Sequence, residues 1–163
     1  MAARVRKIPQ TVTGRLSNAA LTDLSLRNHL SLNALSSKHG AAFHLGSVVR
    51  TMFASFYLFD AGFGDGNLSI YTDADSSLRE LATSRNIESS YRLGSHAVQA
   101  TARLLELYDS QLQTAPLDEL IAAHQRAEGN FHASPERRLS IPELVQRCQR
   151  GRHKVSMDSI VNS

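Results

Sequence analysis

Large apolar residues recur three or four positions apart over residues 41–61, a spacing that places them along one side of a helix. The stripe consists of Leu45, Val48, Val49, Met52, Phe53, Phe56 and Phe59. Burial of each large apolar side chain contributes about 1.5–3 kcal/mol before conformational entropy is subtracted. Since no other stretch gathers as many such residues, we predict that this helix is the core element around which the chain folds.

A helix predicted over residues 18–37 differs from it, because its leucines lie on two opposite sides. At about 100° per residue, one stripe contains Leu21, Leu24, Leu32 and Leu35. Leu26 and Leu30 fall on the opposite side. A helix with two apolar sides either lies in the middle of a bundle or offers one side to a partner. We therefore select Leu26 and Leu30 as the candidate partner-binding surface.

Glycine residues separate the next elements. Gly40 is expected to end the first helix in a left-handed conformation, and the glycine cluster at residues 62–66 to end the second. We expect residues 68–72 to pack as a loop, because a single short extended segment would have no partner strand. A third helix is then predicted from residue 72 or 73 to about residue 85.

Two further helices are predicted over about residues 95–113 and 116–129. Pro116 suits the first turn of a helix, so these two helices should form an antiparallel hairpin with a tight link. Further along the chain, Ser140 and Glu143 have the spacing of a capping box, in which each side chain bonds the other's backbone N–H. This spacing predicts a short helix that extends to about residue 149.

These elements predict an all-α protein in which about five helices form a single compact bundle. The chain of 163 residues suits one domain with a substantial core. The helical core domain is expected over residues 18–133, with its helices between residues 18 and 130. A basic, flexible arm should precede it over residues 1–17, and a short basic helix and tail should follow over residues 134–163.

The net charge of +3 is unevenly distributed along the chain. Residues 1–17 hold four basic residues and no acidic residue, a charge of +4. Residues 18–133 hold eight basic and twelve acidic residues (−4), and residues 134–163 hold six basic and three acidic residues (+3). The candidate contacts with nucleic acid or an acidic partner are Arg4, Arg6, Lys7, Arg15, Arg137, Arg138, Arg147, Arg150, Arg152 and Lys154. No zinc-finger spacing, RNP motif, basic zipper or helix-turn-helix accompanies them, so they support electrostatic contact of low sequence specificity.

Motifs for phosphate or metal binding are incomplete. The glycine cluster follows a predicted helix and has no lysine, whereas a phosphate-binding loop follows a strand and carries one. Asp65, Asn67 and Ser69 alternate as ligands do in a calcium loop. However, Ile70 stands where that loop needs glycine, and Ser76 stands where it needs an acidic residue. We expect no metal ion, no cofactor and no catalytic residue.

Catalysis would require His44, His96 or His124 to meet acidic residues in a pocket. Cys148 is the single cysteine, which excludes an internal disulfide. Neighbouring cations favour a thiolate there, but we interpret Cys148 as a passive thiol on the apolar side of the last helix. No run of eighteen apolar residues is present. We therefore expect a cytoplasmic protein without a membrane partner.

The segments YLFDAGFGDG (residues 57–66) and ARLLELYDSQLQTAPLDELIAAHQR (residues 102–126) resemble a family of small bacterial helical proteins. Members of that family are sometimes labelled Fis-type transcriptional regulators. The resemblance covers roughly residues 19–127 and consists mainly of core and cap residues. It implies a helical fold and assigns no catalytic or base-reading residue. Fis proteins end in a helix-turn-helix, a pattern that this sequence does not show.

The function expected from these observations is non-catalytic. We expect a small regulatory or adaptor protein that binds a protein partner, or a second copy of itself to form a homodimer. The alternative is a DNA-associated transcriptional regulator that uses the basic ends of the chain. An enzyme is the third alternative. Whether the aromatic helix lines a ligand pocket is left open by the sequence.

Overall fold

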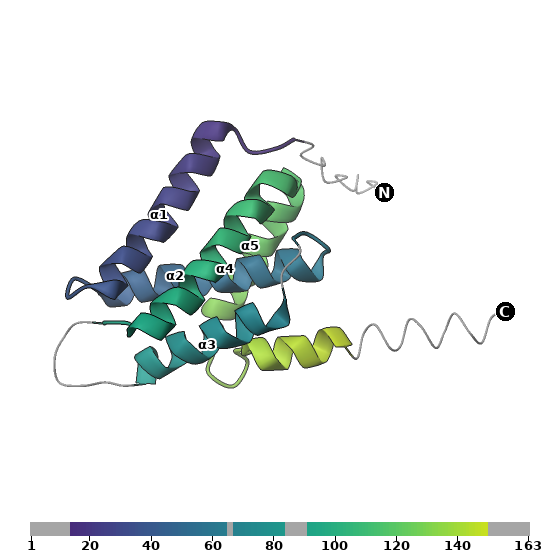
Figure 1. Cartoon of the computed structure of the whole chain (residues 1–163). Coiled ribbons are helices and arrows are strands. Elements are labelled where there is room, and N and C mark those ends of the chain that lie inside the picture. Colours follow the sequence, from purple (N-terminus) through teal and green to yellow (C-terminus); the bar gives the residue numbers. More distant parts are fainter. Residues whose placement is uncertain (1–13, 65–66, 84–90, 150–163) are drawn as a thin grey trace, which may run out of the picture.

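The computed structural model describes residues 14–64, 67–83 and 91–149, and these residues form six helices and no strand. The five labelled helices are α1 (Asn18–Ser36), α2 (Ala42–Asp60), α3 (Leu68–Thr83), α4 (Ser95–Thr114) and α5 (Leu117–Phe131) (Figure 1). A sixth, the C-terminal helix, covers residues 141–149. The all-α class is therefore confirmed, with six helices in place of about five. Residues 1–13 of the predicted arm and residues 150–163 of the predicted tail lie outside the described residues.

Helix α2 is the central element, as predicted. It packs against α1, α3, α4 and α5, and in Figure 1 it runs across the sloping helices α1 and α4. All eight residues at positions 51–58 are buried. Inside this core the ring of Phe56 meets that of Tyr71 edge to face, with centroids 5.4 Å apart. The apolar spacing of residues 41–61 thus identified the helix that the others cover.

The prediction of a loop at residues 68–72 is wrong, because α3 begins at Leu68. The side chain of Asn67 accepts a hydrogen bond from the Ser69 N–H at 3.1 Å, which helps to start the helix. Helical geometry places Tyr71 on the same side as Ala74, so that both are fully buried. The burial of Tyr71 in the core therefore decides the conformation of a segment whose local sequence also suits an extended strand.

Gly40 also has a different role from the one predicted. Positive φ angles occur only at Gly62 and Gly64 among the described residues, at 95° and 88°. At Gly40 the constraint is space, because a Cβ atom there would collide with the carbonyl oxygen of Tyr91. The Tyr91 N–H in turn donates to the Gly40 carbonyl at 3.1 Å. Gly40 therefore allows the chain before α4 to pack against the end of α1.

The link between α4 and α5 is tight, but the two helices do not pack mainly on each other. Pro116 directly precedes α5 and has an extended backbone, and the chain reverses there. Helix α5 then packs chiefly against α2. A direct contact between α4 and α5 is the hydrogen bond of 2.5 Å between Tyr108 and His124. The predicted hairpin thus exists as a turn, while the apolar side of α5 covers α2.

The C-terminal helix is part of the core. Ile141 is fully buried and Leu144 is 5% exposed. The predicted capping box is present, since the Ser140 N–H donates to Glu143 Oε2 at 2.7 Å and the Glu143 N–H donates to Ser140 Oγ at 3.4 Å. This helix therefore adds a sixth member to the bundle. No helix within the described ranges has the length and apolar composition needed to cross a membrane.

Candidate interaction surface

The first half of α1 is the least covered part of that helix. Its buried residues, Asn28, Ser31, Leu32 and Leu35, all lie in the second half. Leu26 and Leu30, the predicted partner-binding residues, are 54% and 56% exposed. The N-terminus of α1 is nevertheless capped, because Ser17 Oγ accepts a hydrogen bond from the Ala20 N–H. Leu21 and Leu24 of this half are partly buried against the core, so the bundle covers it on one side only.

An apolar groove of about 550 Å³ lies between α1 and α5. Leu24 borders it on the α1 side, Leu112 of α4 also lines it, and Leu117, Leu120 and Ile121 line it from α5. Ile121 is itself 41% exposed. Leu26 and Leu30 do not line this groove, and Leu26 borders the groove on the other side of α1. Exposed apolar surface of this kind is characteristic of an interaction site. We call the outer leucines of α1 together with this groove the α1–α5 surface.

One end of the groove is polar and contains His124. Burial lowers the pKa of His124, an effect that the nearby Glu128 carboxylate partly opposes. Burial also raises the pKa of Tyr108, whose hydroxyl lies 2.5 Å from His124 Nε2. Both groups are therefore neutral near pH 7 and share one hydrogen bond. His124 lines this end of the groove together with the Glu128 carboxylate.

A second polar pair lies on the other side of α1. His29 Nε2 is 2.8 Å from Asp109 Oδ2, and this pair lines a groove of about 740 Å³. Asp109 Oδ1 is buried and has no hydrogen-bond partner among the described residues. A carboxylate that orients an imidazole is suited to proton transfer. However, none of the hydroxyl groups in the described ranges bonds to His29, so the pair lacks an adjacent nucleophile there.

The three histidines considered for catalysis lie in three places. His44 Nδ1 accepts a hydrogen bond from the Ala41 N–H at the start of α2. His96 is exposed near the start of α4, and His124 is on α5. Within the described ranges no three His, Cys, Asp or Glu residues are grouped as metal ligands. Cys148 is partly buried against the core.

The predicted basic contacts are only partly described. Arg15, Arg137, Arg138 and Arg147 are exposed, whereas Arg4, Arg6, Lys7, Arg150, Arg152 and Lys154 lie outside the described residues. Arg15 precedes α1 and borders the groove beside Asp109. Arg138 follows α5 and borders a different pocket, between α2 and α3. These two arginines therefore belong to separate surfaces.

The contacts that sequence reasoning missed join positions far apart in the chain. His29 and Asp109 are 80 positions apart, and the buried Ser55 and Gln111 are 56 apart. No local spacing signals such pairs. The described residues define a helical bundle with an incompletely covered first helix. Comparisons with protein-family models, with curated proteins and with solved structures give no significant match to this chain.

Proposed function

We propose that this protein is a non-catalytic regulatory or adaptor protein that acts by protein–protein binding. The observation that carries the proposal is the exposure of Leu26 and Leu30, at 54% and 56%, on a side of α1 that the bundle leaves uncovered. Exposed leucines one helical turn apart are typical anchors of a helix that binds in an apolar groove. The α1–α5 surface is the proposed interface.

The proposed occupant of this surface is a second copy of the chain. The chain carries both the apolar anchors Leu26 and Leu30 and, on another side of α1, the apolar groove that Leu24 borders, so each of two copies can supply anchors to the groove of the other. Self-complementarity is the requirement for a twofold dimer, in which the same surface contributes from both subunits. In such a dimer Leu26 and Leu30 of each copy would enter the groove beside Leu24 and Ile121 of the other copy. This arrangement would cover the exposed half of α1.

The test is the oligomeric state of the full chain over a dilution series, measured by sedimentation or by light scattering after size exclusion. We expect a dimer that dissociates on dilution. A double variant with Leu26→Glu and Leu30→Glu should weaken association about a hundredfold or more, because each change would bury a charge in an apolar interface. Both positions are exposed, so the fold should be retained.

Phe43 provides the matched control. It is 70% exposed and lies in the first turn of α2, and it does not line the groove. The variant Phe43→Glu removes a similar apolar area at another site, and it should associate like the wild type. A wild-type chain that stays monomeric at the highest concentration would refute self-association. Equal weakening by Phe43→Glu would refute the choice of surface.

The DNA-associated alternative rests on the basic ends of the chain. It predicts salt-dependent retardation of duplex DNA that is lost when residues 1–17 and 134–163 are removed. Removal of residues 134–163 would also delete the buried Ile141 and Leu144. Neutralising the exposed Arg137 and Arg147 is therefore the cleaner variant. The absence of retardation at low salt would reject this alternative.

A further inference from the structure

A pocket of about 510 Å³ lies between α2, α3 and the segment that follows α5, away from the α1–α5 surface. Its walls are mainly apolar and include Leu45, Val49, Met52, Phe53, Leu78 and Phe131. This volume and this lining are characteristic of small-molecule sites, in which a few polar groups fix the orientation of the ligand. The aromatic helix α2 therefore lines a pocket, a point that the sequence left open.

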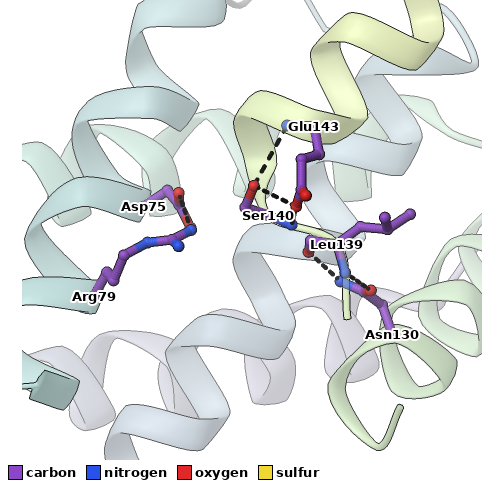
Figure 2. Close-up of polar contacts among 6 residues, drawn as sticks. All are labelled: Asp75, Arg79, Asn130, Leu139, Ser140 and Glu143. Atoms are coloured by element: carbon purple, nitrogen blue, oxygen red, sulfur yellow. Dashed lines mark hydrogen bonds and ion pairs between the residues drawn. The ribbon is translucent and has the colours of Figure 1, made fainter. Parts of the chain in front are cut away.

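The packing that forms the pocket depends on two local features. Gly46 allows the Phe131 ring to approach α2, since a Cβ there would lie 3.3 Å from Phe131 Cζ. Asn130 holds the segment that follows α5, because its side chain donates to the Leu139 carbonyl at 2.9 Å and accepts from the Leu139 N–H at 2.8 Å (Figure 2). The wall opposite α3 is thus fixed by hydrogen bonds.

Two carboxylates line the pocket, and each already has a partner. Figure 2 shows Asp75 bonded to Arg79 on α3 and Glu143 bonded to Ser140 at the start of the C-terminal helix. Asp75 is 7% exposed and accepts from the Arg79 guanidinium at 2.8 Å. Bonds from the Ser140 N–H and hydroxyl lower the pKa of Glu143, so this carboxylate is ionised and stabilised by the cap.

Arg138 differs from these groups, because it has no ion pair with a carboxylate among the described residues. Its guanidinium lies over the Phe131 ring, 5.8 Å from the centroid, and one nitrogen donates to the Ala133 carbonyl at 3.4 Å. A guanidinium carries five N–H donors, so most of its donors face solvent or the pocket. Arg79 likewise donates one hydrogen bond, of 2.8 Å, to Asp75. Among the charged side chains that line the pocket, Arg138 is therefore the arginine without a carboxylate partner in the described part of the chain.

We propose that this pocket binds a monoanionic amphiphile, namely a medium-chain carboxylate. The hydrocarbon chain would lie against Met52, Phe53 and Phe131, and the carboxylate would accept hydrogen bonds from Arg138 and Arg79. Arginine suits this role because its planar donors match the two oxygens of a carboxylate. The site uses none of the residues proposed for dimerisation, so either proposal can fail without the other.

Three probes of equal chain length test the head group by calorimetry on the full chain: decanoate, decanol and decylammonium. Decanoate should bind with one saturable site and more tightly than the other two. Arg138→Gln should weaken decanoate binding about tenfold or more, because it removes a hydrogen bond between two charged groups. The same change should alter decanol binding less than about twofold, since the alcohol carries no charge.

Two further variants locate the binding site. Arg137→Gln changes the exposed neighbour that does not line the pocket and should leave decanoate binding unchanged. Ala82→Trp places a large ring at the mouth from an exposed position on α3, so it should weaken decanoate and decanol together without unfolding the chain. Absence of saturable decanoate binding would overturn the proposal. Tighter binding of decylammonium, equal binding of decanol, or no effect of Ala82→Trp would overturn it equally.

Discussion

Helices α1 and α2 have the same length, 19 residues, and both are rich in large apolar residues, yet their surroundings differ. Helix α2 is covered by four other helices, and every residue at positions 51–58 is buried. Helix α1 packs against α2 and α4 and buries four residues. The number of apolar residues therefore does not decide burial. What decides it is whether other elements are present to cover both sides of the helix.

The enclosure of α2 also changes how its polar residues are accommodated. Ser55 is fully buried, and its hydroxyl donates to the side-chain oxygen of Gln111 at 2.7 Å. Gln111 returns a hydrogen bond to the Ser55 carbonyl at 3.0 Å. On α1 the exposed Asp23 and Arg27 pair with each other, whereas the buried Asn28 accepts a hydrogen bond from the Thr51 hydroxyl of α2. A covered helix must find its hydrogen bonds inside the protein.

The largest difference should appear when the same side chain is truncated in the two helices. Leu58→Ala in α2 removes a fully buried side chain and should lower the free energy of unfolding by about 2–5 kcal/mol. Leu30→Ala in α1 removes a side chain that is 56% exposed and should change it by at most about 0.5 kcal/mol. Urea unfolding at a protein concentration where the wild type is monomeric measures both values. Similar losses in the two variants would contradict the contrast between the helices.

The buried hydrogen bonds of α2 should give an intermediate effect. Gln111→Ala removes four contacts, to Ser55 Oγ, the Ser55 and Phe63 carbonyls and the Tyr71 hydroxyl. Since buried polar groups then lose partners, we expect a loss of about 2–3 kcal/mol in the same unfolding experiment. Gln113→Ala is the control, because Gln113 is exposed on the same helix. A loss at Gln111 no larger than at Gln113 would show that the network contributes no net stability.

Periodicity predicted what depends on local sequence. The apolar spacing of residues 41–61 identified the central helix, and the opposite placement of Leu26 and Leu30 anticipated their exposure. Periodicity did not predict the helical conformation of residues 68–72. That conformation depends on the burial of Tyr71 against Phe56, a residue of another helix. The capping box at Ser140 was predicted because all its partners lie within four residues.

The candidate sites could be predicted only in part, for the same reason. Leu26 and Leu30 share one helix, so the sequence could select them. The apolar groove between α1 and α5 depends on Leu112 and Ile121, which come from α4 and α5. The second pocket combines α2, α3 and the segment after α5. Arg138 was selected from the sequence for its charge alone, since its position over the Phe131 ring depends on tertiary packing.

The smallest expected effect is a pH dependence of the folding stability that arises from His124. Burial lowers the pKa of His124, which borders the α1–α5 groove, whereas the unfolded chain has an ordinary histidine pKa of about 6.5. As the pH falls through that value, the unfolded state takes up the proton first. Stability that is fully present above about pH 6.5 should therefore decrease towards the lower pKa of the folded state. The enclosed helix α2 has no histidine at positions 51–58.

His124→Gln isolates this contribution. Glutamine can still hydrogen-bond to Tyr108 but does not titrate. The variant should therefore lose less stability than the wild type between about pH 8 and about pH 5.5, a range that spans the unfolded pKa. His96→Gln changes an exposed histidine and should keep the wild-type pH dependence. Urea midpoints at the two pH values give the comparison. If His124→Gln and the wild type lose stability in parallel, the acid sensitivity arises elsewhere, and the open side of the bundle does not carry it.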